Sequence, residues 1–192
     1  MSSSPKNEAH TLVSLAATGD RLAQQKLVAR LQGRVHTIAL SILGNRTDAE
    51  DTTQACLFEI LRSAGQFRGD NLVGWADKIA VRTAIRHAKQ RRIRATQYEQ
   101  RPDFDSFVSE EAEPELAFGL PRTVVDYLSL LPETRRVAVV LRHVMDYTVE
   151  EIAELTETSP NTVKDRLVHA RAQLRRLIRR DLSLSTAGGA ND

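Results

Sequence analysis

A strongly acidic segment divides this chain of 192 residues. Residues 103–115, with the sequence DFDSFVSEEAEPE, hold six acidic residues and no basic one. Pro102 precedes the segment, and Pro114 lies near its end. A long stretch without a helix or strand pattern is unusual inside one compact domain, so this one is most simply a spacer. We therefore predict a flexible acidic linker at residues 96–119, with a folded domain on each side.

The sequences on both sides of this linker favour helices. The chain has only nine glycines and six prolines, and 5% of its residues are aromatic, which argues against a fold of strands and turns. Apolar residues recur at steps of three and four, the period of one helix face, at Leu27, Leu31, Val35, Ile38 and Ile42. The expected fold class is all-α, with small helical domains at residues 10–95 and 120–182 and disordered tails at residues 1–9 and 183–192.

The next helix of the first domain is predicted from its capping residues. Thr47 is followed three residues later by Glu50, the spacing of a capping box. The residues expected on the buried side of this helix are Leu57, Ile60 and Leu61.

A loop and a basic helix are predicted to complete the first domain. Residues 65–74, GQFRGDNLVG, hold three of the nine glycines and are typical of a loop. The helix that begins near Trp75 carries six Lys or Arg and no acid between Arg82 and Arg94.

The second domain is predicted to contain four helices, the first at residues 121–130. The second is expected to bury Val137, Val140, Leu141 and Val144. Thr148 and Glu151 form a capping box for the short third helix, VEEIAELT. Ser159 can cap the fourth, with Pro160 in the first turn, where its missing N–H costs nothing. A short helix, a tight turn and a longer basic helix predict a helix-turn-helix.

The fourth helix has one apolar and one polar face. From Pro160 to Arg180 it carries seven Lys or Arg and a single acid, Asp165. The predicted buried stripe consists of Val163, Leu167, Ala170 and Leu174, packed against Ile152 and Ala153. Helical winding places Asn161, Lys164, Asp165, Val168 and Ala172 opposite that stripe, facing a DNA major groove. The residues expected to flank that face, near phosphates, are Thr162, Arg166, Arg171, Arg175 and Arg176.

A simpler interpretation of this helix remains open: an exposed amphipathic helix whose arginines serve solubility. The turn before it fits a helix-turn-helix less well at one position, because Glu157 stands where glycine is frequent. A residue with a side chain in the left-handed conformation costs roughly 1 kcal/mol there.

Two separate parts of the chain resemble bacterial RNA polymerase sigma factors. The sequence DYTVEEIAELTETSPNTVKDRLVHARAQLRRLI, preceded by LPETRRVAVVLRHV, is similar to sigma region 4. The sequences ILGNRTDAEDTTQACLFEIL and FRGDNLVGWADKIAVRTAIRHAKQRR are similar to sigma region 2. The order of the two regions, the acidic linker and the length resemble the extracytoplasmic-function (ECF) group of the sigma-70 family, over about residues 10–182.

The resemblance implies a fold, partners and site residues. Residues 10–95 would be the region 2 bundle and residues 120–182 the region 4 helix-turn-helix. Core RNA polymerase would be bound by Asp51 and Gln54. The minus-thirty-five promoter element, as duplex DNA, would be bound by Asn161, Thr162, Lys164, Asp165, Arg166, Val168, His169, Arg171, Arg175 and Arg176. The single-stranded non-template strand of the minus-ten element would be bound by Phe67, Arg68, Gly69, Asp70, Asn71, Arg82, Arg86, Lys89, Arg91 and Arg92.

The resemblance also leaves a second partner and two other functions open. Some members of the family bind an anti-sigma factor, which would be a second partner. The acidic linker would either thread the basic interior of the polymerase or serve only as a spacer. The first alternative function is a dimeric helix-turn-helix repressor on palindromic half-sites. The second is a sigma-like decoy that binds an anti-sigma partner without recognising promoters.

Several classes of function are disfavoured by composition. The five histidines show no metal-ligand spacing, and the one cysteine, Cys56, excludes an internal disulfide. We expect no cofactor, no metal and no enzymatic activity. No apolar run reaches the roughly 18 residues that span a bilayer, and the N-terminus lacks the apolar core of a secretion signal. We therefore expect no membrane insertion and a cytoplasmic location.

Overall fold

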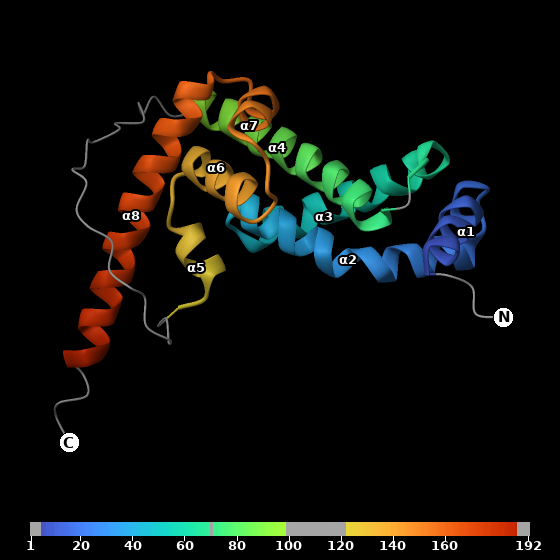
Figure 1. The fold of residues 1–192 in the computed structure, drawn as a ribbon, viewed down its shortest axis with the longest axis horizontal. Coiled ribbons are helices and arrows are strands. Elements are labelled where there is room, and N and C mark those ends of the chain that lie inside the picture. Colours follow the sequence, from blue (N-terminus) through green and yellow to red (C-terminus); the bar gives the residue numbers. More distant parts are fainter. Residues whose placement is uncertain (1–4, 70, 99–121, 188–192) are drawn as a thin grey trace. The chain divides into compact units, whose positions relative to one another are not determined.

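The computed structural model describes residues 5–69, 71–98 and 122–187, and every regular element in these ranges is a helix (Figure 1). The all-α expectation is therefore confirmed for the described residues. The chain divides into two compact units, residues 1–91 and 92–192. Each unit has its own apolar core, and each is described by itself below.

Unit 1 is built around one long helix. Its elements are α1 (Pro5–Ala17), α2 (Arg21–Leu43), α3 (Arg46–Ser63), the short 3-10 helix η1 (Ala64–Gln66) and most of α4 (Leu72–Tyr98), which continues past residue 91. Helix α2 packs against α1 and α3. Its predicted apolar face is confirmed, because all five residues are at most 6% exposed. Each such burial stabilises the fold by about 1.5–3 kcal/mol.

The N-terminal helix is longer than its sequence pattern indicates. Helix α1 begins at Pro5, so the prediction of a disordered tail over residues 1–9 is wrong for residues 5–9. Proline is well suited to the first helical position. The helix also buries Ala9, Val13 and Ala16, which gives its first turns a packing partner.

The cap of α3 lies two residues earlier than predicted. Asn45, not Thr47, is the N-cap, and its Oδ1 accepts a hydrogen bond from the Asp48 N–H at 2.8 Å. Helix α2 ends at Leu43, and its C-cap Gly44 has a φ of 71°, the left-handed conformation that glycine adopts without strain. Only Gly44 and Asn45 separate the two helices, so the capping of α3 falls on Asn45.

The buried face of α3 is also more polar than predicted. It consists of Ala49, Thr52, Thr53, Cys56 and Ile60, whereas Leu57 and Leu61 are only half-buried. The two threonine hydroxyls are satisfied inside the unit. Thr53 donates to the Ala49 carbonyl at 2.6 Å, and Thr52 lies 3.0 Å from Nδ1 of His87 on α4.

Helix α4 begins at Leu72, three residues before the predicted start near Trp75. The Asn71 side chain caps it, because its Oδ1 accepts the Gly74 N–H at 2.9 Å. Gly74 leaves the room for this cap. A Cβ at that position would lie 2.7 Å from the Asn71 amide nitrogen.

Unit 2 places a long helix against three shorter ones. Its elements are α5 (Val124–Ser129), α6 (Glu133–His143), α7 (Val149–Thr156) and α8 (Pro160–Ala187), and α8 packs against α5, α6 and α7. Val140, Leu141, Ile152 and Val163 are fully buried. Val144 was predicted in this core but is 57% exposed, because α6 ends at His143 and the helical period no longer holds.

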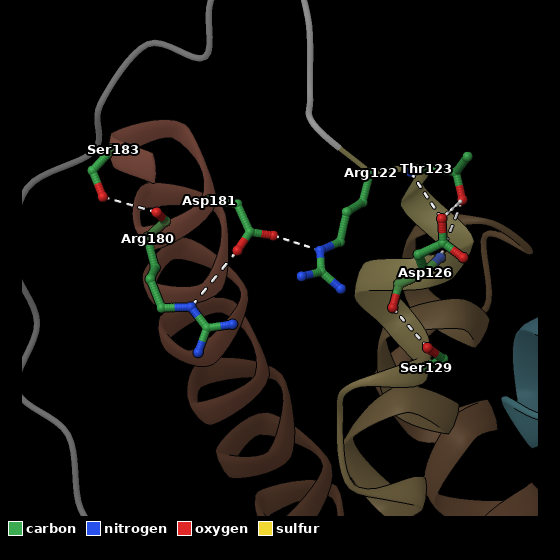
Figure 2. A network of polar contacts seen from close by, with 7 residues as sticks. All are labelled: Arg122, Thr123, Asp126, Ser129, Arg180, Asp181 and Ser183. Atoms are coloured by element: carbon green, nitrogen blue, oxygen red, sulfur yellow. Dashed lines mark hydrogen bonds and ion pairs between the residues drawn. The ribbon is translucent and has the colours of Figure 1, made fainter. Parts of the chain in front are cut away.

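A buried carboxylate fastens the C-terminal part of α8 (Figure 2). Asp181 is only 7% exposed, and its Oδ2 accepts a hydrogen bond from Nε of Arg122 at 2.7 Å. Burial opposes its ionisation, but the hydrogen bond and charge of Arg122, aided by the charge of Arg180, outweigh burial and lower the pKa of Asp181. Helix α8 itself continues to Ala187, so the predicted disordered tail at residues 183–192 is wrong for residues 183–187.

Candidate polymerase and nucleic-acid interfaces

The helix-turn-helix of unit 2 is capped as the sequence predicts. At the start of α7, Thr148 Oγ1 accepts the Glu151 N–H at 3.2 Å, and the Glu151 carboxylate accepts the Thr148 N–H at 2.8 Å. At the start of α8, Ser159 Oγ accepts the Thr162 N–H at 3.1 Å, and Pro160 is the first helical residue. These caps fix the directions of both helices, and thus of the side chains on α8.

The turn between α7 and α8 carries the predicted backbone strain. Glu157 is the C-cap of α7 in the left-handed conformation, with φ 52° and ψ 48°. The Thr158 N–H donates to the Ala153 carbonyl at 2.9 Å, which closes the helix end.

Glycine in place of Glu157 is expected to stabilise the protein by about 0.5–1 kcal/mol, because it removes the steric cost of this conformation. Urea unfolding of the full chain measures the change. Glu154→Gly is the matched control, since Glu154 is exposed within α7 and should lose about 1 kcal/mol there. An unchanged or lower stability of E157G would contradict strain at this position.

The N-terminal half of α8 presents the predicted exposed face. Val163, Leu167 and Ala170 are buried, and Leu174 is half-buried. The exposed residues on the opposite side form one continuous row, here called the reading face: Asn161, Lys164, Asp165, Val168 and Arg171. Ala172 was predicted on this face but is half-buried, and Arg171 takes its place. Thr162, Arg166, His169 and Arg175 are half-buried, and Arg176 is exposed. The structure thus brings all ten predicted residues onto one helix, with five of them in the most exposed row.

Helix α4 of unit 1 carries a second basic surface. Four of its predicted residues, Arg82, Arg86, Lys89 and Arg92, are exposed and spaced by three or four positions, so they share one side of the helix. Lys78 is exposed one turn earlier on the same side. Lys78 was not among the predicted residues, although it lies one step of four residues before Arg82. These five residues are here called the basic stripe.

Arg91 does not belong to the basic stripe, although sequence reasoning grouped it with the strand-binding residues. Its Nη1 forms an ion pair with Asp48 at the start of α3. The pKa of Asp48 is lowered chiefly by the hydrogen bond from Asn45; burial opposes this change, and Arg91 adds to it. Arg91 therefore holds α3 against α4, and its role as a strand contact stays a prediction.

The loop before α4 is more structured than a flexible binding loop. Phe67 is 3% exposed, and its ring lies 5.3 Å from that of Trp75 and 5.6 Å from that of His10, measured between centroids. Its prediction as a DNA contact is corrected, because the ring packs inside the unit. Trp75 is half-buried against it, in agreement with the expected core position.

The polar residues of this loop mostly serve the loop itself. Arg68 Nη1 donates to the carbonyls of Gly65 at 2.7 Å and Phe67 at 3.0 Å. Asn71 is exposed, but its amide oxygen caps α4. Gly69 is exposed, and Asp70 lies outside the described residues.

One face of α3 combines polar residues with an unexpected aromatic one. Asp51 and Gln54 are both exposed, as the resemblance requires for a docking surface. Phe58, four residues after Gln54 and seven after Asp51, shares their side of the helix and is 73% exposed. These three residues are here called the docking face. Sequence reasoning missed Phe58, because a phenylalanine beside Leu57 and Ile60 resembles a core residue.

The remaining reactive groups are placed as structural residues. Cys56 is fully buried, and burial raises the pKa of its thiol to about 11, so it stays protonated at neutral pH. Across the described residues there is no group of His, Cys, Asp or Glu that could hold a metal ion. None of the helices in those ranges is both long and apolar enough to cross a membrane.

Comparisons with known proteins agree with this arrangement of two units. Residues 27–93 match the family model described as Sigma-70 region 2, and residues 122–174 match Sigma-70, region 4. A solved structure of the Bartonella quintana sigma factor RpoE, in complex with the anti-sigma factor NepR, covers 81% of this chain and 96% of its own. It has a TM-score of 0.51 and 22% sequence identity, which supports the fold.

Curated relatives extend the similarity over nearly the whole chain. The ECF RNA polymerase sigma factor SigE of Mycolicibacterium smegmatis is 30% identical over 178 residues, covering 89% of this chain and 68% of the relative. SigM of Mycobacterium tuberculosis is 30% identical over 168 residues, covering 87% and 83%. The sigma-E factor of Haemophilus influenzae is 30% identical over 180 residues, covering 85% and 91%. The chain belongs to the ECF group of RNA polymerase sigma factors.

Proposed function

We propose that the chain binds core RNA polymerase and directs it to specific promoters, without catalysing a reaction itself. The docking face of α3 contacts the polymerase. The reading face of α8 enters the major groove of the minus-thirty-five element, where a helix fits and base edges are distinguishable. The basic stripe of α4 holds the backbone of the separated strand at the minus-ten element. The place of action is the cytoplasm.

The observation that carries this proposal is the presence of two basic helices, α4 and α8, in two separate compact units. Each helix carries several Lys or Arg residues that can bind a nucleic acid backbone. Two units joined by a linker can contact two promoter elements at once, which raises the affinity for DNA that carries both. A repressor with one helix-turn-helix would need only the reading face.

Promoter opening follows from differential binding. Unstacking a base costs a few kcal/mol, so opening requires contacts that are made only with the separated strand, whose backbone the basic stripe then holds. Binding therefore shifts the equilibrium towards the open form, and no nucleotide hydrolysis by this chain is needed.

The Bartonella relative is named as a complex with an anti-sigma factor, and a protein antagonist of that kind would be a further partner.

In vitro transcription tests this function. Core polymerase alone should give no defined start sites on a pool of genomic promoter fragments, and the added chain should produce a discrete set of transcripts. The double variant Asp51→Ala, Gln54→Ala should lose these transcripts and bind core polymerase more weakly, while the full-length chain keeps its affinity for duplex DNA. Transcripts that do not depend on the chain would contradict the proposal, and unchanged core binding by the variant would place the docking face elsewhere.

A further inference from the structure

The reading face contains two residues that do not suit a phosphate backbone. Asp165 and Val168 are both exposed, and Val168 is 44% exposed. They lie three positions apart, so they are neighbours on the helix surface. A carboxylate repels phosphates, and an exposed valine gains nothing from them. On a helix with seven cations between residues 160 and 180, this pair needs a different contact.

Structural roles for Asp165 are not found in the described part of the chain. Its carboxylate has no hydrogen-bond or ion-pair partner among the described residues. It is the sixth residue of α8, beyond the first turn in which a carboxylate benefits from the helix dipole. The cap of the helix is supplied by Ser159. The acid therefore serves neither the cap nor the dipole of α8.

Base edges in the major groove carry a hydrogen-bond donor for the Asp165 carboxylate and a methyl group for the Val168 side chain. A carboxylate accepts a hydrogen bond from the N4 amino group of cytosine, and an apolar side chain contacts the C5 methyl group of thymine. Side chains three residues apart are separated by about 4.5 Å along the helix axis. That separation is similar to the 3.4 Å spacing of successive bases, so the pair spans neighbouring base pairs.

We propose that Asp165 and Val168 select a cytosine amino group next to a thymine methyl group in the minus-thirty-five element. This inference rests on the proposed function, and it names the bases that the proposed function leaves open. Lys164, exposed beside them, supplies a donor for guanine acceptors on the same edge. The cations around the reading face then position the helix on the DNA backbone, and Asp165 and Val168 determine which bases are preferred.

The test uses the full chain bound to core polymerase and a duplex library randomised over the minus-thirty-five region. Selection should return an element that contains a cytosine beside a thymine, read on either strand. Deoxyuridine in place of that thymidine removes only the methyl group and should weaken binding roughly fourfold. Val168→Ala, which removes two methyl groups from this contact, should lose most of this difference between the two duplexes. Val124→Ala, at a valine that is 60% exposed on α5, is the matched control and should keep the full discrimination.

The acid is tested by exchanging the base instead of the methyl group. A cytosine-to-thymine change at the selected pair places a carbonyl oxygen against the carboxylate and should weaken wild-type binding about tenfold or more. Asp165→Asn, whose amide can donate to that oxygen, should tolerate the change. If the complex selects no sequence at all, the proposed function itself fails. If it selects an element but deoxyuridine has no effect, or Val168→Ala discriminates as strongly as the wild type, this inference is overturned.

Discussion

Alanine in place of Phe58 is expected to weaken binding of the chain to core RNA polymerase by about thirtyfold. A phenyl ring that is 73% exposed on α3 has no packing role in unit 1 that explains it. Aromatic residues are enriched at protein interfaces, and truncating an anchor of this kind commonly costs about 2 kcal/mol of binding free energy, which corresponds to that factor. Fluorescence anisotropy with labelled chain and purified core polymerase measures it.

The same substitution should leave the folded chain intact, because little of the ring is buried. Melting temperature should change by no more than a degree or two, and duplex DNA affinity should be unchanged. Leu22→Ala is the matched control, since Leu22 on α2 is 68% exposed and lies outside the docking face. A core affinity equal to that of the L22A control would remove Phe58 from the interface.

Methionine in place of Arg136 is expected to destabilise unit 2 by about 2–3 kcal/mol. Arg136 is only 5% exposed, and its Nη1 donates to the carbonyls of Leu131 at 3.0 Å and Ser129 at 3.3 Å. Methionine keeps the apolar stem but leaves these carbonyls, at the end of α5, without their charged donor. Buried acceptors that lose their partner cost about 1–3 kcal/mol each, and hydrogen bonds to charged groups are at the upper end.

Hydrogen exchange suits this test, because it reports the stability of each part of a protein separately. Peptides from α6 and α8 should lose protection in R136M. Fluorescence of Trp75, the one tryptophan of the chain, should report an unchanged unit 1. Arg142→Met is the control: Arg142 is exposed and donates to the Tyr147 carbonyl at 3.1 Å, so its loss should cost less than about 1 kcal/mol. Equal protection in R136M and R142M would contradict a structural role for the buried guanidinium.

Features with local causes were predictable from the sequence. The apolar period of α2, the capping box of Thr148 and Glu151, and the strained Glu157 each depend on residues within a few positions of one another. The reading face was predictable for the same reason, since helical winding alone decides which residues of α8 share a side.

Features that depend on contacts between helices were not predictable. Arg91 looks like its basic neighbours until α3 brings Asp48 against it. Phe67 looks like a loop residue until Trp75 and His10 enclose its ring. Phe58 shows the converse, because this apolar residue, which lies between predicted core residues in the sequence, is 73% exposed among the described residues of unit 1.

The ion pair of Arg122 and Asp181 ties a residue just before α5 to the C-terminal part of α8 (Figure 2). Asp181 lies twenty positions after Asn161, which is about 30 Å along the helix axis. A force applied at Arg122 would therefore act on α8 far from the residues that are proposed to read DNA. At that distance even a small force would exert a large torque on the other end of the helix.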